Sequence, residues 1–200
     1  MDSVQVVALL RARVFSLTAQ DLLLDVATCP DLWGLIMEIG FVDDVVTLVV
    51  LDDGSVSIYL RSGKGRIGCG LHSGVRATAA RALQQARTVA LTEAANAAFP
   101  MPVDDEVHFY FHTSTGLRAC AVSRTQLEKG NQALSELYCA ARAVIDRVEL
   151  TGAGHPIADA IEDAAESVNS QPESTLSAMS RGKPCRILPS VGSAARRSRR

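Results

Sequence analysis

The sequence predicts an α+β fold in which helices pack on a single antiparallel β-sheet of about five strands. Three observations lead to this prediction: two hairpin patterns, a long amphipathic segment between them and a second such segment after them. Hairpins join antiparallel neighbours directly, whereas parallel strands need long crossover connections. The predicted order is α-β-β-(β)-α-β-β-α, preceded by an N-terminal helical extension.

The chain is long enough for one domain with extensions. It has 200 residues, of which 48% are hydrophobic, and domains usually contain about 100–150 residues. We predict an N-terminal helical extension (1–30), an α+β domain (31–150), a weak acidic helix or linker (151–168) and a disordered basic tail (169–200) that is rich in Ser and Arg.

Helical spacing is typical of the first forty residues. Apolar side chains recur every three or four positions at Val4, Val7, Leu10, Val14 and Leu17, and a second short helix is predicted over 19–27. Asp31 is a favourable N-cap, and Gly40 is a common C-terminal stop. We therefore predict a third helix over 32–39, with Trp33 as a core anchor.

Two pairs of strands follow. The runs 45–51 and 55–60 flank an Asp-Asp-Gly turn, and the runs 107–111 and 117–122 flank the turn Thr113–Gly116. An Asp-Gly turn between apolar runs is the strongest short-range signal for a hairpin. Long amphipathic segments over 72–98, between the hairpins, and over 132–149, after them, predict the main helices.

Charge separates the body from the tail. The net charge is −2, and residues 181–200 contain seven basic residues and no acidic one, so residues 1–180 carry a net charge of −9. An acidic body argues against a nucleic-acid-binding domain, which needs a basic face. Nucleic acid or an acidic partner is expected only at a tail cluster of four arginines: Arg196, Arg197, Arg199 and Arg200.

The cysteines and the apolar runs indicate a compartment. The five cysteines are odd in number, widely spaced and without a CxxC pair, which argues against a disulfide framework or a zinc ribbon and favours a reducing cytoplasm. The N-terminus lacks the pattern of a signal peptide, and no apolar run approaches the length of a membrane span.

A glycine-rich segment is the strongest candidate for a binding loop. Its residues are Gly63, Lys64, Gly65, Arg66, Gly68 and Gly70, followed by His72. The GxGxxG spacing after a strand and before a helix is the order that a phosphate-binding loop needs. A dinucleotide site, however, requires a preceding parallel strand and an acidic residue about 20 positions later, and the sequence provides neither.

The favoured interpretation of this segment is structural. It predicts a turn over 62–65 and a short strand over 66–70, in which Gly68 and Gly70 let the next helix lie close to the sheet. The other interpretation is a small anion or a partner peptide held by the loop and the helix N-terminus, with Lys64 and Arg66 supplying charge.

Other candidate sites are weaker. His108 and His112 lie on one strand, where this spacing separates them by about 13 Å, too far for one metal ion. Cys69 and Cys139 are expected to be buried, inert thiols, and the acidic pairs occur in turns, where Asp bonds the local backbone. We predict no catalytic residue, no metal site and no cofactor.

The order of elements resembles the roadblock/longin/profilin-like architecture. The resemblance is carried by VVTLVVLDDGSVSIYL, GVRATAARALQQAR and VHFYFHTSTGLRACAV. It implies a five-stranded antiparallel sheet between helices and, from roadblock-like domains, a non-enzymatic module that dimerises or binds small GTPases and scaffolds. The stretch from WGLIMEIG to GRIGCG also resembles an uncharacterised bacterial family of unknown function.

The sequence therefore leads to two expected functions. The first is a cytoplasmic interaction or regulatory module with a protein partner, including a second copy of itself. The alternative is a nucleotide- or phosphometabolite-binding protein that uses the glycine-rich segment between Gly63 and Gly70.

Overall fold

The computed structural model describes residues 2–24, 31–89, 99–130 and 133–159. The helical elements are α1 (Ser3–Phe15), α2 (Ser73–Val89), α3 (Arg124–Glu128) and α4 (Ala133–Thr151), with short 3₁₀ helices η1 (Ala19–Leu22) and η2 (Cys69–Leu71). The strands are β1 (Leu32–Gly40), β2 (Val45–Leu51), β3 (Val56–Leu60), β4 (Gly65–Ile67), β5 (Glu106–Thr113), β6 (Gly116–Ser123) and β7 (His155–Pro156).

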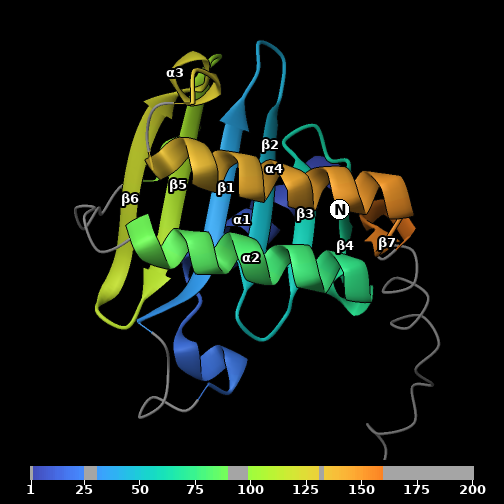
Figure 1. Ribbon diagram of the computed structural model, residues 1–200. Helices are drawn as coiled ribbons and strands as arrows, with labels where there is room; N and C mark the ends of the chain where they lie inside the picture. Colours follow the sequence, from blue (N-terminus) through green and yellow to red (C-terminus); the bar gives the residue numbers. More distant parts are fainter. Residues whose placement is uncertain (1, 25–30, 90–98, 131–132, 160–200) are drawn as a thin grey trace, which may run out of the picture.

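These strands form one antiparallel sheet, which confirms the predicted fold class. The order across the described part of the sheet is β6-β5-β1-β2-β3-β4-β7, as Figure 1 shows from the side of α2 and α4. The sheet has seven strands rather than about five. The additional strands are β1, which lies inside the sheet between β5 and β2, and β7, a two-residue strand after α4 that pairs with β4.

The predicted helix over 32–39 is wrong, because this segment is the central strand β1. It pairs with β2 on one side and with β5 on the other, and all nine of its residues are buried. A strand covered on both faces shows a continuous apolar run rather than alternation, so periodicity alone does not distinguish it from a short buried helix. The flanking Asp31 and Gly40 then favoured the wrong choice.

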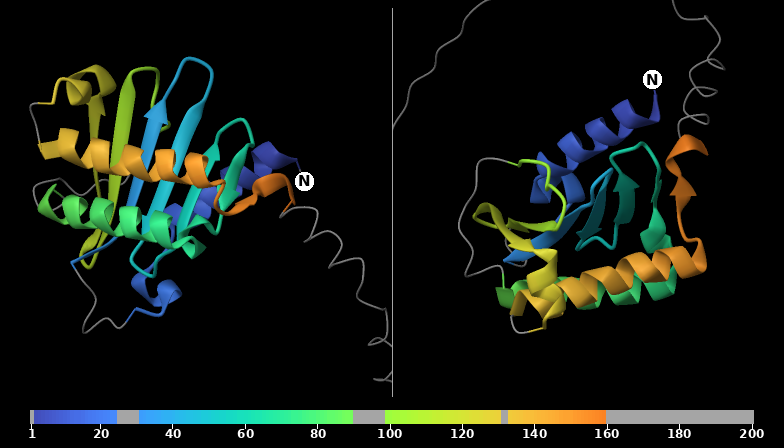
Figure 2. Two further views of the ribbon diagram at one scale, coloured as in Figure 1. Left: turned by 45° about the vertical axis from the view of Figure 1, so that its right-hand side comes forward. Right: turned by 90° about the horizontal axis from the view of Figure 1, so that it is seen from above.

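The sheet lies between two helical layers (Figure 2). Helices α2 and α4 cover one face, where the larger core gathers Leu35, Met37, Phe109 and Leu137. Helix α1 and η1 lie on the opposite face over a smaller core that includes Trp33, which is 3% exposed and so confirms its predicted burial.

The long helices begin close to where they were predicted. Helix α2 starts at Ser73, and residues 90–98, the end of the predicted 72–98 helix, lie outside the described residues. Helix α4 covers Ala133–Thr151. Of the predicted 19–27 helix, the described residues form only the 3₁₀ helix η1, which is capped by Leu23 at a φ of 55°, and residues 25–27 lie outside the described residues. Of the predicted acidic helix or linker (151–168), residues 151–159 are described and include β7, whereas residues 160–168 and the whole basic tail lie outside the described residues.

Candidate functional site

The glycine-rich segment forms an edge of the sheet rather than a free loop. Gly65 and Arg66 pair with Tyr59 and Ile58 of β3, and Arg66 also pairs with β7. The predicted turn precedes β4, but the strand ends at Ile67 and is followed by η2. Backbone groups of β4 are therefore engaged in two strand ladders, on β3 and on β7.

Close packing explains three of the glycines. A Cβ atom on Gly70 would lie 1.8 Å from the carbonyl oxygen of Gly54, and one on Gly63 would lie 2.4 Å from Oγ of Ser3. Gly65 has a φ of 153° and presses against β3. These glycines permit close approach to protein atoms, as expected of Gly70. The same role predicted for Gly68 is wrong, because a Cβ there would meet only His155 at 3.9 Å, and Gly68 instead adopts a φ of 70°.

The charged residues of the segment do not converge on one point. The guanidinium of Arg66 donates hydrogen bonds to the carbonyl oxygens of Ala153 (2.7 Å), Gly154 (2.7 Å) and Gly152, and so holds the chain after α4. Lys64 and His72 are exposed. A pocket of about 360 Å³ lies beside the segment, lined by residues that include Gly54, Gly68, Gly70 and Arg76. The predicted ligand loop stays a prediction, and this pocket is where its ligand would contact Gly68 and Gly70.

The cysteines and the acidic turns have distinct roles. Cys69 is fully buried, and burial raises the pKa of its thiol, as expected of an inert group. Cys139, in contrast, is exposed, so its predicted burial is wrong. Asp53 accepts hydrogen bonds from the backbone N–H and the hydroxyl of Ser55, as predicted for a turn, whereas Asp105 accepts from Ser123 and Thr125, which lie 18 and 20 positions later. Within the described ranges, no group of three or more His, Cys, Asp or Glu side chains is placed to hold a metal ion.

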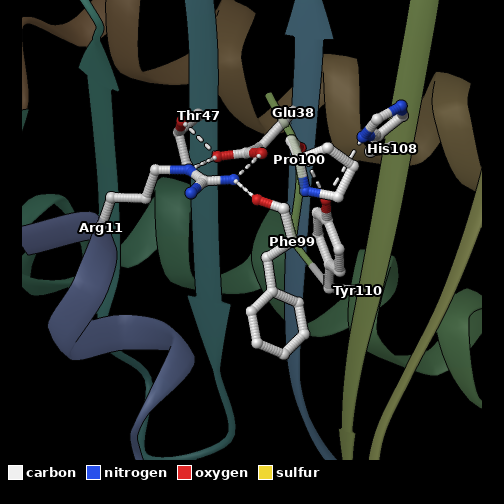
Figure 3. Close-up of polar contacts among 7 residues, drawn as sticks. All are labelled: Arg11, Glu38, Thr47, Phe99, Pro100, His108 and Tyr110. Atoms are coloured by element: carbon white, nitrogen blue, oxygen red, sulfur yellow. Dashed lines mark hydrogen bonds and ion pairs between the residues drawn. The ribbon is translucent and has the colours of Figure 1, made fainter. Parts of the chain in front are cut away.

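A buried ion pair that was not predicted from the sequence lies between α1 and the sheet. Arg11 of α1 donates to both carboxylate oxygens of Glu38 on β1, at 2.6 and 2.8 Å, as Figure 3 shows. The Glu38 side chain is fully buried, and that of Arg11 is 15% exposed. Thr47 of β2 donates a third hydrogen bond to Glu38, at 3.1 Å. A carboxylate in the centre of the sheet is thus neutralised by one helix.

Further polar groups surround this pair. Arg11 also donates to the carbonyl oxygen of Phe99, and the Tyr110 hydroxyl donates to that of Pro100, 3.1 Å away (Figure 3). Nδ1 of His108 lies 3.2 Å from the same hydroxyl. Burial, with the negative charge of Glu38, raises the pKa of Tyr110 and of Tyr59. Because Arg11 and Glu38 neutralise each other, these polar contacts stabilise the packing of α1 on the sheet.

The ion pair was missed because its partners lie far apart in the sequence. Arg11 and Glu38 are 27 positions apart, and Arg11 fitted the polar side of a surface helix. Glu38, in the predicted helix, was one acidic residue in an apolar run. A single acidic residue in a run that is buried on both faces is the signal that could have found the pair, because a buried charge needs a partner.

Strand β6 forms one edge of the described sheet. It pairs with β5 from Gly116 to Ser123 without a register shift. Because Ser114 and Thr115 make a two-residue turn, the pairs Thr113–Gly116, Phe111–Arg118 and Phe109–Cys120 carry the β5–β6 hydrogen bonds. The backbone groups of the alternate residues, Leu117, Ala119 and Ala121, therefore point away from β5, where no described strand lies.

Comparison of the chain with models of protein families, with curated protein sequences and with solved structures gives no match. The helices of the described ranges include none with the length and apolar character needed to cross a membrane.

Proposed function

We propose that the chain is a non-enzymatic cytoplasmic interaction module that pairs with a second copy of itself along β6. The observation that supports this function is the β6 edge. Exposed edges of natural sheets are usually protected by charged side chains, especially lysines, or by prolines, bulges or extreme shortness. Strand β6 is eight residues long, follows β5 without a bulge, contains neither Lys nor Pro and has Arg118 as its single charged residue.

A two-fold axis beside β6 would join the two sheets. Antiparallel pairing of β6 with its copy is isologous, because the same backbone groups meet their equivalents in the partner. The outward residues Ala119 and Ala121 have small side chains that leave room for the second strand. The opposite edge is a poorer template, because β7 has only two residues.

Sedimentation equilibrium tests this proposal with one pair of variants. Ala121 is exposed, and its N–H points away from β5. Ala121→Pro removes that outward donor while leaving the ladder to β5 complete, since proline is tolerated where the N–H faces solvent. Ala121→Val keeps the donor and serves as the matched control.

We expect a dimer for the wild type and for Ala121→Val, and at least a tenfold weaker dimer for Ala121→Pro with an unchanged circular dichroism spectrum. A monomeric wild type at high concentration contradicts self-association. If Ala121→Pro dimerises as tightly as the wild type, the dimer does not form through the β6 edge.

The alternative function is binding of a nucleotide or phosphometabolite beside the glycine-rich segment. The pocket lined by Gly54, Gly68, Gly70 and Arg76 supports it, although the Arg76 Nε atom already donates to the Gly70 carbonyl at 2.9 Å. A thermal-shift panel of nucleotides and phosphorylated metabolites tests it, with Arg76→Gln expected to abolish any shift. If no compound of the panel changes the melting temperature, the proposal that the chain binds such ligands is wrong.

A further inference from the structure

Two loops at one end of the sheet expose apolar side chains. Residues 41–44 join β1 to β2, and residues 103–106 lead into β5. Because β5 is antiparallel to β1, the two loops lie at the same end of the sheet (Figure 1). We call their three exposed apolar residues the end patch: Phe41 (39% exposed), Val42 (78%) and Val103 (64%).

Close contacts hold the two loops together. A Cβ atom on Gly40 would lie 1.8 Å from the carbonyl oxygen of Val103, so glycine is needed for this approach at the end of β1. The guanidinium of Arg124 lies 4.8 Å from the ring centroid of Phe41 and 3.6 Å from the carboxylate of Asp104. The end patch is therefore one connected surface, and connected apolar surface with a polar rim marks interaction sites.

The rim of the end patch is acidic. The two loops have the sequences FVDD and VDDE, with five acidic residues and no basic one. Arg61 donates to the carbonyl oxygen of Asp43, and Arg124 lies near Asp104. Five acidic against these two basic side chains still leave this end of the sheet negative. A segment that fits the end patch should therefore combine apolar side chains with positive charge.

Residues 181–191, which we call the inner tail segment, have this composition. They lie outside the described residues, and their sequence is RGKPCRILPSV. Three basic residues stand there without an acidic one, beside three branched apolar residues, Ile187, Leu188 and Val191. The cluster of four arginines at 196–200 has a similar charge but no large apolar residue. The two basic parts of the tail therefore differ in what they can contribute to an apolar surface.

The chain is long enough to bring the inner tail segment to the end patch. The described residues end at Asp159, just after β7, and Arg181 follows 22 positions later (181 − 159). Twenty-two residues reach up to about 70 Å when extended, whereas seven strands at about 4.8 Å spacing span about 30 Å. A segment that is tethered in this way has an effective concentration of up to about millimolar, so modest contacts suffice for docking.

We propose that the inner tail segment docks on the end patch of its own chain. Ile187 and Leu188 pack against Val42 and Val103, and the basic side chains pair with the acidic rim. The four arginines at 196–200 are not required, because the end patch needs apolar contacts as well as charge. This inference is independent of the β6 edge and does not require a dimer.

Limited proteolysis of the full chain measures this docking. Trypsin cleaves after arginine, and the rate at Arg186, in the inner tail segment, is divided by the rate at Arg197, which serves as an internal reference. Val42→Lys replaces an apolar contact by a positive charge. It should raise this ratio about tenfold, which is the value of burying one valine side chain.

Leu150→Lys is the matched control. Leu150 lies on α4 and is as exposed as Val42, at 79% against 78%, so the same substitution there should leave the cleavage ratio unchanged. Added NaCl should raise the ratio of the wild type, because salt screens exposed ion pairs.

Amide chemical shifts provide a second measurement that leaves the folded body unaltered. Neutralising the inner tail segment with Arg181→Gln, Lys183→Gln and Arg186→Gln should move the amide signals of Val42 and Val103. Replacing the four arginines at 196–200 by glutamine should leave both signals unchanged.

Four results would overturn the proposal. They are an unchanged cleavage ratio in Val42→Lys, an equal rise in Leu150→Lys, and amide signals of Val42 and Val103 that do not respond to the inner tail substitutions. The fourth is a wild-type ratio that rises on dilution, because the docked segment would then belong to a second copy of the chain.

Discussion

The two faces of the sheet are built from different chemistry. Under α2 and α4 the core is apolar, and the helices are held by the area that they bury. Under α1 the core is smaller, and Glu38 and His112 lie among its neighbours. Both long helices are amphipathic over many turns, whereas Val7 is the only buried residue of α1.

This difference indicates how each helix is fixed. Apolar burial is roughly additive in area and does not demand one geometry, so α2 and α4 tolerate small changes in their contacts. An ion pair in a low-dielectric site is worth little beyond its desolvation cost unless both partners are placed well. The position of helix α1 on the sheet is thus fixed by the ion pair between Arg11 and Glu38.

The largest expected effect comes from breaking the ion pair. Arg11→Met leaves the Glu38 carboxylate buried without its partner, and we expect the free energy of unfolding to fall by about 3–5 kcal/mol. Adding Glu38→Gln removes the charge, keeps an acceptor for Thr47 and should restore most of the loss. Urea unfolding measures both variants.

Leu137→Ala, on the apolar face, is the comparison for this variant. It removes a fully buried side chain and should cost about 2–5 kcal/mol, with no recovery from Glu38→Gln. If Glu38→Gln fails to rescue Arg11→Met, the two faces are not distinguished by charge.

A second prediction concerns the loss of folding stability as the pH falls. Because the pKa of His112 in the folded chain is about 4 and its ordinary value is about 6.5, the unfolded chain takes up the proton first as the pH falls. The contribution of His112 is therefore complete above about pH 6.5 and is lost toward pH 4. The slope is at most about 1.4 kcal/mol per pH unit, and the total about 3 kcal/mol.

Urea unfolding at a series of pH values between 7 and 4 measures this loss, with His112→Phe as the reference. The variant should lack the His112 part of the slope, so the stability of the wild type relative to the variant should fall by up to about 3 kcal/mol between pH 7 and pH 4. Parallel profiles for the two proteins would mean that His112 titrates normally in the folded state.

The smallest effect concerns the glycine that leads into α2. Gly70→Ala places a methyl group against the Gly54 carbonyl and should destabilise the chain by about 1–3 kcal/mol through overpacking. Gly74→Ala is the control, because its new Cβ meets only side chains, the exposed ring of His72 at 3.2 Å and Arg147 at 3.9 Å, and alanine favours helix. Thermal unfolding compares them. Equal melting temperatures would show that the glycines are not required for packing.

Local patterns predicted the fold well where one face of an element is exposed. Turn residues predicted the hairpin around Asp52, Asp53 and Gly54. The helical spacing of apolar residues predicted α2 and α4. The close packing of Gly70 was also predictable, since glycine marks close approach. The spacing of apolar residues predicted the wrong element at residues 32–40, because a strand that is buried on both faces does not alternate between polar and apolar residues.

The sequence by itself determined the α+β class, the antiparallel pairing and the two long helices, because these depend on interactions between near neighbours in the chain. Only the tertiary structure decided that 32–40 is the central strand, that Arg11 reaches Glu38 and that Trp33 turns onto His112. Each of these depends on side chains that are distant in sequence, and their energies come from desolvation and pairing within the folded core.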